Sequence, residues 1–309
     1  DVVFCTVTPH DGIEAGVALS STVTVENTPP VLSSVTLTPE DPNTDDILSC
    51  ELGTTTDSDG TVTFSYQYLW NVNGVDTAVT ATTLTSVDFS KNDAIFCAVT
   101  PNDGTSDGDT VTSNTVTAIN TLPTIDTVEV APAVATASDT LSCAWSGFSD
   151  ADGDADASTI VWAVNGVPVG TDAELSEQFV GGDEVSCTVT PTDDEGAGDA
   201  VTQAIIIENT APTLDGVSIS PDPAYANSTL TCDLGTTTDI DGTASFSYLY
   251  SWEVSGLVSA TTGPTLNAAE FIVGDTVNCS ATPNDGTENG ITVTSTDVTV
   301  INSAPVVGM

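Results

Sequence analysis

The stretch FCAVTPNDG, Phe96–Gly104, is the best guide to the fold of this chain because the same phrase returns in three other places. The other copies are FCTVTPHDG from Phe4, SCTVTPTDD from Ser186 and NCSATPNDG from Asn278. Their cysteines lie 92, 90 and 92 residues apart. A fixed spacing of this kind indicates a tandem repeat of one structural unit, here about 91 residues long.

A second phrase divides the chain into repeats. It occurs as NTPP, NTLP, NTAP and NSAP at Asn27, Asn120, Asn209 and Asn302. Since proline neither continues a strand interior nor donates to a ladder, each copy is interpreted as a linker. We therefore expect the chain to be a window on a longer array. The predicted parts are the C-terminal part of a domain (1–28), a first repeat (29–120), a middle repeat (121–209), a last repeat (210–302) and the start of a further repeat (303–309).

The local pattern within each repeat is typical of strands. Threonine and valine alternate in TVTSNTVTAI and TVTVEN, and no apolar set recurs at helical spacing over a useful length. Asn-Gly pairs in NVNGV (Asn71–Val75) and AVNGV (Ala163–Val167) predict hairpin turns. The predicted fold class is all-β: tandem immunoglobulin-like β-sandwiches of about seven strands each, in a linear array.

Each complete repeat has an early cysteine, then a tryptophan, then a late cysteine. This is the order of an immunoglobulin-like sandwich, in which a disulfide ties the two sheets and the indole packs on it. Buried free thiols are the alternative, and disulfides would imply an oxidising compartment. Cys5 has no partner in this segment. The predicted sets are Cys50, Trp70 and Cys97; Cys143, Trp162 and Cys187; and Cys232, Trp252 and Cys279.

The repeats resemble PKD-type or cadherin-like immunoglobulin-like repeats of bacteria. The resemblance rests on an Asp-Gly loop before a strand with tyrosine and tryptophan, as in TTTDSDGTVTFSYQYLWNVNG, and on an NDG loop after the late strand. It covers essentially the whole chain and implies an extracellular array at a bacterial cell surface.

The charge of the chain excludes several classes of partner. The 309 residues include 45 acidic residues and one basic residue, Lys91, which gives a formal net charge of −44. Such a surface repels nucleic acid and anionic lipid, and small cations are its natural counterparts. No apolar run in this segment is long enough to span a membrane. With a single histidine, His10, and no basic clamp for phosphate, we expect no enzyme activity.

Acidic loops recur where three segments of each repeat should meet. In an immunoglobulin-like sandwich the loops after the early and late cysteine strands lie at the end where the chain enters. Oxygen ligands in excess of charge balance favour calcium (Ca²⁺), and the spacing does not fit an EF-hand. Solvated turns are the alternative interpretation. The predicted ligands are Glu26, Asn27, Asp57, Asp59 and Asp103; Asn120, Asp150, Asp152, Asp154, Asp156, Asp193 and Asp194; and Glu208, Asn209, Asp239, Asp241 and Asp285.

Two functions are consistent with these features. The first is a structural and adhesive array, a calcium-stiffened stalk or surface filament whose partners are copies of the same chain. The second is an accessory module that binds polysaccharide or matrix for a secreted enzyme or adhesin. Aromatic residues alternate in Phe64–Trp70 and in Phe246–Trp252, so each row lies on one face of a strand. Because the tryptophan is on that face of the strand, we expect the whole aromatic row to face the core and not a sugar.

Overall fold

A computed structural model describes residues 1–304. Residues 305–309, most of the predicted start of a further repeat, lie outside the described residues. The strands of the middle repeat belong to one compact unit, and its two acidic loops belong to the other. The domain boundaries stay predictions. Unit 1 comprises Asp1–Pro123, Ser149–Asp156 and Thr192–Ala197, and unit 2 comprises Thr124–Phe148, Ala157–Pro191 and the chain from Gly198 onward.

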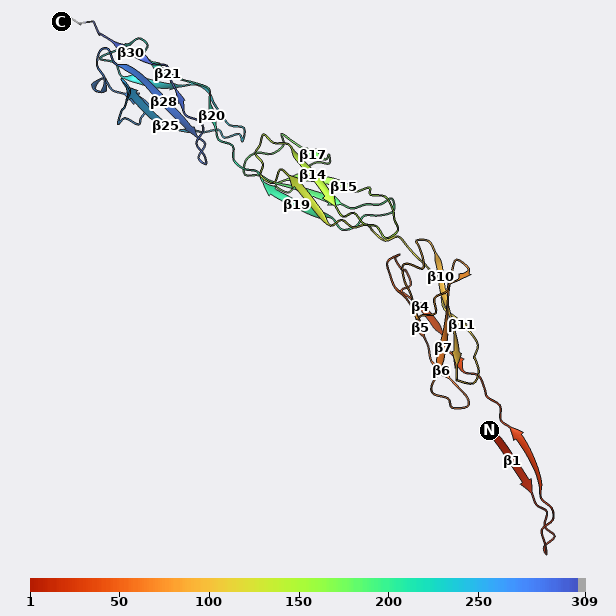
Figure 1. Ribbon diagram of the computed structural model, residues 1–309. Helices are drawn as coiled ribbons and strands as arrows, with labels where there is room; N and C mark the ends of the chain where they lie inside the picture. Colours follow the sequence, from red (N-terminus) through yellow and green to blue (C-terminus); the bar gives the residue numbers. More distant parts are fainter. Residues whose placement is uncertain (305–309) are drawn as a thin grey trace. The chain divides into compact units, whose positions relative to one another are not determined.

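The first repeat forms two small antiparallel sheets and a short extra pair (Figure 1). One sheet has the order β4-β5-β9, the other has the order β11-β10-β7-β8 with β12 also on β10, and β3 pairs with β6. The strands are β3 (Val31–Leu32), β4 (Val35–Thr38), β5 (Leu48–Leu52), β6 (Thr55–Thr56), β7 (Ser65–Val72), β8 (Val75–Asp76), β9 (Thr83–Leu84), β10 (Ala94–Asn102), β11 (Val111–Thr112) and β12 (Val116–Thr117).

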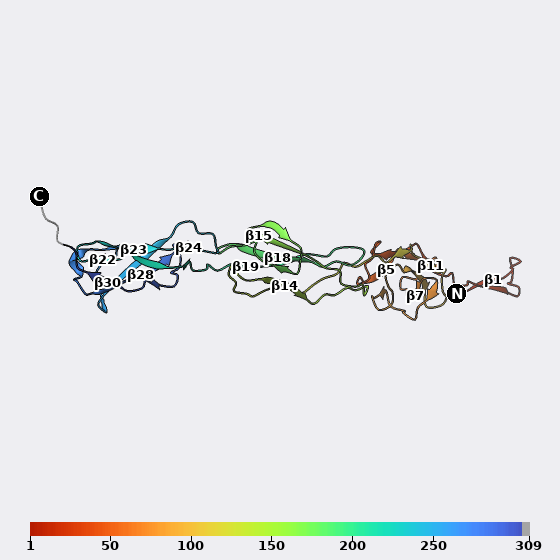
Figure 2. The same ribbon diagram turned by 90° about the horizontal axis from the view of Figure 1, so that it is seen from above.

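The middle repeat has the same plan, with sheets β13-β14-β17 and β16-β15-β18-β19. Figure 2 shows β18 between its two partners, β15 and β19. The strands are β13 (Thr127–Ala131), β14 (Leu141–Ser146), β15 (Thr159–Val164), β16 (Val167–Gly170), β17 (Glu174–Leu175), β18 (Glu184–Thr190) and β19 (Val201–Ile206).

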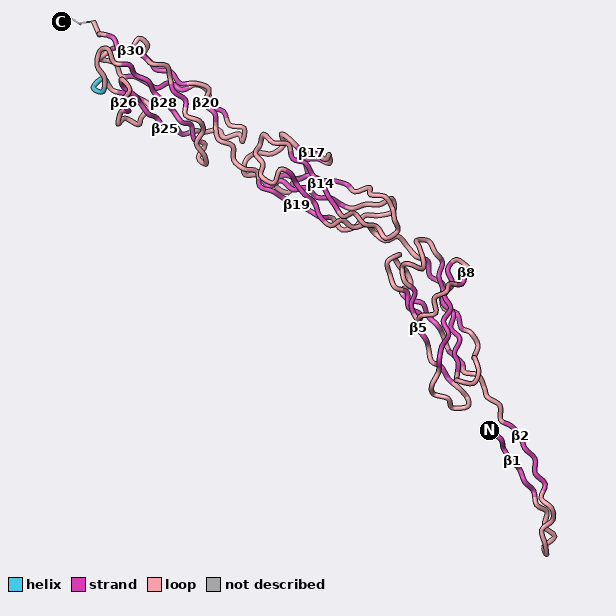
Figure 3. The backbone as a smooth tube through the Cα atoms, viewed as in Figure 1, coloured by secondary structure: helices cyan, strands magenta, loops and turns pink. Residues whose placement is uncertain are grey.

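The last repeat repeats the plan again, with sheets β21-β23-β27 and β22-β30-β28-β25-β26, β29 on β28, and the pair β20-β24. Within residues 1–304 the helical content is the single 3₁₀ turn η1, which Figure 3 shows in cyan. The described residues contain no helical segment that could span a membrane. The elements are β20 (Thr213–Leu214), β21 (Val217–Ser220), β22 (Ala224–Tyr225), β23 (Leu230–Leu234), β24 (Thr237–Thr238), β25 (Ser247–Val254), β26 (Leu257–Val258), β27 (Thr265–Leu266), η1 (Ala268–Glu270), β28 (Thr276–Asn284), β29 (Val293–Thr294) and β30 (Val298–Ile301).

A disulfide and a tryptophan lie at the centre of each core. The bonds join β5 to β10, β14 to β18 and β23 to β28, so each ties one sheet to the other, with Cα–Cα separations of 6.3, 6.3 and 6.0 Å. Closing a loop of this length stabilises by about 4 kcal/mol in the chain-entropy model. The tryptophans are fully buried, and each indole N–H donates to a carbonyl oxygen 2.9 Å away. The bonded pairs are Cys50–Cys97, Cys143–Cys187 and Cys232–Cys279.

The predicted Asn-Gly hairpin turns are confirmed. Asn73 and Gly74 both have positive φ, 52° and 81°, as do Asn165 and Gly166, and this is the backbone that a tight two-residue hairpin requires. The last repeat forms the same turn with Ser255 in place of asparagine, at a φ of 50°. The turn therefore depends chiefly on the glycine that follows.

The parts of the aromatic rows nearest the tryptophans face the cores, as predicted. Tyr66 and Tyr68 are half-buried against the core of the first repeat, and Tyr250 packs in the same way in the last repeat. The hydroxyl of Tyr66 bonds the Thr55 hydroxyl at 2.9 Å, which ties β7 to the short strand β6. These rings are therefore structural.

The N-terminal residues form a single antiparallel hairpin of β1 (Val2–Val7) and β2 (Leu19–Thr24). Every residue of both strands is exposed. Cys5 is exposed and unbonded within the described chain, whereas Cys97, Cys187 and Cys279, at the same point of the repeated phrase, are bridged.

Candidate metal centre at the repeat junctions

Each complete repeat begins with an Asn-Thr linker whose asparagine is held by the late acidic loop. The side-chain amide of Asn120 donates to Asp193 Oδ2 at 2.9 Å. The same bond joins Asn27 to Asp103 at 2.8 Å and Asn209 to Asp285 at 2.9 Å. We call the linker with its two acidic loops a junction and name the junctions after Asn27, Asn120 and Asn209. The residues of each junction lie within one compact unit.

The late aspartate also organises its own loop. Asp193 Oδ1 accepts the backbone N–H groups of Glu195 and Gly196 at 2.6 and 2.5 Å. The bond from Asn120, together with these backbone bonds, lowers the pKa of Asp193 below the ordinary aspartate value. The pKa values of Asp103 and Asp285 are lowered for the same reason, with the linker asparagine as the largest cause. These three carboxylates are therefore ionised and fixed in place.

The second aspartate of each Asp-x-Asp-Gly loop holds the linker backbone. Asp152 Oδ2 accepts the N–H of Thr121 at 2.7 Å. The equivalent contacts are Thr28 to Asp59 at 2.5 Å and Thr210 to Asp241 at 2.6 Å. These bonds account for the asparagine of the linker phrase, whose side chain is a donor, whereas the next residue contributes a backbone N–H that any residue except proline has. That these aspartates ligate a metal stays a prediction.

The first aspartate of the same loop has an oxygen without a partner. Its Oδ1 accepts the N–H of the second aspartate, at 2.6 to 2.8 Å. Its Oδ2 is buried, and none of the described residues donates a hydrogen bond to it in Asp57, Asp150 or Asp239. A buried carboxylate oxygen without a donor is costly unless a cation or water satisfies it. The recurrence of this oxygen in three repeats fits a cation site.

Carboxylates gather most closely at the Asn120 junction. Among the described residues, Asp150, Asp154 and Asp193 form the group whose ligand atoms all lie within 4.8 Å of one another. Asp193 is only 5% exposed. Hard oxygen ligands at this separation suit calcium or magnesium.

The other predicted ligands are less closely grouped. At the Asn27 junction, Asp57 lies near enough to Asp103 to contribute, after Asn27 and the backbone bonds, to lowering the pKa of Asp103. The remaining predicted acids are exposed and lie outside the close group of three. They are Glu26, Asp156, Asp194 and Glu208.

Sequence reasoning missed the role of Lys91. Its ammonium nitrogen lies 2.6 Å from Asp154 Oδ2, 3.1 Å from Glu195 Oε1 and 3.2 Å from Asn120 Oδ1. The bond to Asp154, with that to Glu195, raises the pKa of Lys91 above its ordinary value. The only basic residue of the chain is thus part of the Asn120 junction.

A signal for this contact was present in the alignment of the repeats. Glu195 lies eight residues after the late cysteine, where the first and last repeats have Thr105 and Thr287. Asp154 follows the loop glycine, where those repeats again have threonine, Thr61 and Thr243. The two acids are therefore found only in the repeat that meets the lysine.

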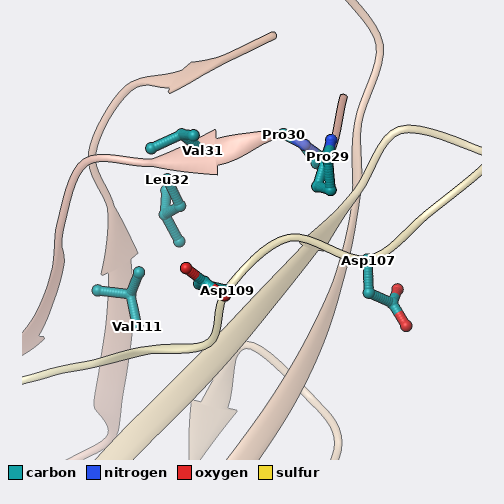
Figure 4. A pocket seen from close by; sticks show the side chains of 7 residues that line it. All are labelled: Pro29, Pro30, Val31, Leu32, Asp107, Asp109 and Val111. Carbon is teal, nitrogen blue, oxygen red and sulfur yellow. The ribbon is translucent and has the colours of Figure 1, made fainter. Parts of the chain in front are cut away.

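A shallow cavity of about 280 Å³ lies beside the Asn27 linker. Figure 4 shows Asp109 turned toward Leu32 and Asp107 turned away from the cavity. The aligned residues of the last repeat are Asn289 and Ile291, so the acidic lining does not recur. We assign the cavity no ligand. Its lining is Pro29, Pro30, Val31, Leu32, Asp107, Asp109 and Val111.

No family profile and no curated protein sequence matches this chain. Among solved structures, a Ca²⁺-stabilised adhesin that helps an Antarctic bacterium bind ice is 19% identical, covers 97% of this chain and 81% of its own, and has a TM-score of 0.32. The FN1–FN3 domains of chicken CNTN1 are 11% identical, with coverages of 88% and 98% and a TM-score of 0.26. Three domains of the outer capsid protein Hoc of bacteriophage RB49 are 15% identical, with coverages of 89% and 100% and a TM-score of 0.30. At these scores none of the likenesses carries an argument about function.

Proposed function

We propose that this chain is a structural and adhesive array of immunoglobulin-like repeats, of the PKD-type or cadherin-like kind, at a bacterial cell surface. In this proposal calcium binds at the junctions and stiffens one repeat against the next. The repeats act as a spacer that extends from the cell surface and associates with other copies. We propose no catalytic activity. Neighbouring copies of the same chain are the proposed partners.

One observation carries the calcium part of the proposal. The buried Oδ2 of Asp57, Asp150 and Asp239 has no donor among the described residues. Calcium, when bound, supplies a divalent charge that six to eight oxygens can share. The chain's own residues hold the oxygens in position: the linker asparagine fixes the late aspartate, and the loop backbone fixes the first aspartate. The proposed ligands are Asp57 and Asp103; Asp150, Asp154 and Asp193; and Asp239 and Asp285.

The extracellular assignment is supported by the disulfides, since such bonds persist mainly in oxidising compartments. The alternative, a polysaccharide-binding module, lacks a comparable observation. Its best candidates were the aromatic rows, and Tyr66, Tyr68 and Tyr250 of those rows are half-buried against the cores. Calcium could also bridge two strongly acidic surfaces that otherwise repel, which is how copies of the chain would associate.

Isothermal titration calorimetry of the chain with calcium chloride in about 150 mM salt tests the proposal. We expect binding in the range of about 0.1 to 1 mM, as for extracellular modules. The triple variant D57N/D150N/D239N should lose this binding. A matched control, D41N/D172N/D199N, removes the same charge from exposed positions and should keep it. No heat of binding at several millimolar calcium would contradict the proposal.

Small-angle scattering tests the mechanical part. If calcium stiffens the junctions, the scattering of the chain should change from that of a flexibly jointed molecule to that of a stiffer and more extended one when calcium is added. The D57N/D150N/D239N variant should show no such change. Equal scattering of the wild-type chain with calcium and with a chelator would argue against stiffening.

A further inference from the structure

Lys91 and Gly181 occupy the same position of the same β-turn in consecutive repeats. In the first repeat, the N–H of Ser90 donates to Asp93 Oδ2 at 2.7 Å, and in the middle repeat the N–H of Val180 donates to Asp183 Oδ2 at 2.8 Å. The residue after each donor faces the next junction. It is Lys91 at the Asn120 junction and Gly181 at the Asn209 junction.

The Asn209 junction has no room for a side chain at this position. The Gly181 N–H donates to Asp241 Oδ1 at 2.6 Å. A Cβ on Gly181 would lie 2.8 Å from the Asp241 carboxyl carbon and 3.0 Å from Asn209 Cα. Two oxygens of this junction, Asp239 Oδ2 and Thr210 Oγ1, are buried without a partner among the described residues. The Asn209 junction therefore combines open oxygens with the absence of a nearby ammonium group, within the described part of unit 2.

The Asn120 junction already holds a cation. The Lys91 side chain is 17% exposed, and its ammonium bonds Asp154, which also belongs to the close group of three carboxylates. A calcium ion that used Asp154 would lie a few ångströms from that ammonium. Charges of +1 and +2 about 6 Å apart repel enough to weaken binding about tenfold, even at the dielectric constant of water.

We propose that Lys91 is a built-in counter-ion that holds the Asn120 junction together without metal and lowers the calcium affinity of that junction. The inference rests on the proposed function, because it concerns the regulation of the same sites. It makes the junctions unequal: the one with the most carboxylates binds calcium more weakly than the one at Asn209. Lys91 is thus a residue that sets the affinity and order of calcium binding along the chain.

Hydrogen exchange of the full chain, followed by mass spectrometry across a calcium titration, tests this inference. The peptides of interest cover the acidic loops 149–156 and 237–243. In the wild type, protection of 237–243 should reach its midpoint at the lower calcium concentration. In Lys91→Met the midpoint of 149–156 should fall about tenfold, and that of 237–243 should not move. In chelator, Lys91→Met should exchange faster than the wild type at 149–156.

Two further variants separate the effect of the Lys91 charge from the effect of changing a side chain at this position of the turn. Lys91→Arg keeps the charge and should behave as the wild type. Val273→Met places the same methionine at the aligned, half-exposed position of the last repeat and should change neither midpoint. An unchanged 149–156 midpoint in Lys91→Met, while the loops of the wild type respond to calcium, would overturn the inference alone. If neither loop responds to calcium in any variant, both the proposed function and the inference fail.

Discussion

The Asn120 and Asn209 junctions share one set of bonds and differ in what meets it from the preceding repeat. In both, the linker asparagine bonds the late aspartate and the linker threonine N–H bonds the second loop aspartate. At Asn120 the preceding repeat contributes the side chains of Lys91 and Thr44 and one backbone N–H, and at Asn209 it contributes the backbone N–H of Gly181. The same arrangement of aspartates is therefore bonded by a lysine ammonium group at Asn120, and by the backbone of a closely approaching glycine at Asn209.

Thr44 adds hydrogen bonds at the Asn120 junction that the Asn209 junction lacks among the described residues. Its hydroxyl donates to Asp152 Oδ1, and its N–H donates to the Thr121 hydroxyl at 2.9 Å. The aligned residue of the middle repeat is Ala137, as the matching bridges of Asn43 and Thr136 show. The hydroxyl of Thr210 is then left without a partner among the described residues. The Asn120 junction is therefore more fully hydrogen-bonded, and the Asn209 junction is more open to an added ligand.

Loss of a core disulfide should destabilise the middle and last repeats most, and by similar amounts. Replacing a core disulfide by alanines, C143A/C187A in the middle repeat or C232A/C279A in the last, should destabilise the affected repeat by about 4 kcal/mol. Thermal unfolding measures the loss. Similar losses would locate the difference in the junctions, whereas a large inequality would mean that the sandwiches differ as well.

The next effect concerns the second loop aspartate. Asp152→Ala or Asp241→Ala removes an acceptor of two hydrogen bonds, and bonds to a charged group contribute about 1.5 to 3 kcal/mol. The amide of Thr121 or Thr210 should then exchange about 10 to 100 times faster. Amide exchange by NMR measures this rate. Unchanged exchange in both variants would mean that these bonds do not hold the linker.

A smaller effect should be confined to the Asn209 junction. Gly181→Ala forces a methyl group against Asp241 and Asn209, and overpacking of this kind costs about 1 to 3 kcal/mol. Gly216→Ala is the matched control because its Cβ would meet open space. Exchange of the Thr210 amide should rise in Gly181→Ala alone. A similar rise in both variants would assign the effect to lost backbone freedom and not to the junction.

The smallest expected difference between junctions is in their response to acid. The pKa values of Asp193 and Asp285 are both lowered in the folded chain, chiefly by the linker asparagine. Their stabilising contribution is complete above the ordinary aspartate pKa of about 3.9 and is lost as the pH falls through the lower folded value. NMR titration of the Asn120 and Asn209 side-chain amides should show both bonds opening below about pH 4. Opening of either bond near neutral pH would contradict this assignment.

Much of the fold could be predicted because the same sequence pattern occurs in each repeat. The order Cys50, Trp70, Cys97 predicts both a bond between sheets and a buried indole, and two further copies make coincidence a poor explanation. The hairpin turns followed from Asn-Gly pairs, whose backbone preference is local. Ser255 shows the limit of that rule, because the glycine after it was sufficient.

The sequence indicated that acidic loops meet at the linkers, but it did not indicate the separate role of each aspartate. Asp150 and Asp152 are equivalent in the sequence pattern. In the structure, Asp150 has a buried oxygen without a partner among the described residues, and Asp152 accepts a hydrogen bond from the linker. That distinction depends on how the loop turns, since the Asp152 N–H bonds Asp150 Oδ1. The place of Lys91 depends on contact between consecutive repeats, which no local pattern encodes. Only its co-occurrence with Asp154 and Glu195 hinted at the contact.

In the proposed function, one arrangement of aspartates binds calcium at the junctions, and Lys91 makes the Asn120 junction less dependent on calcium. The most direct measurement is NMR amide exchange of Thr121 and Thr210 in the full chain, first with several millimolar calcium and then with excess chelator. Chelation should accelerate amide exchange of Thr210 strongly and of Thr121 much less. Equal acceleration of both amides, or none at either, would contradict it.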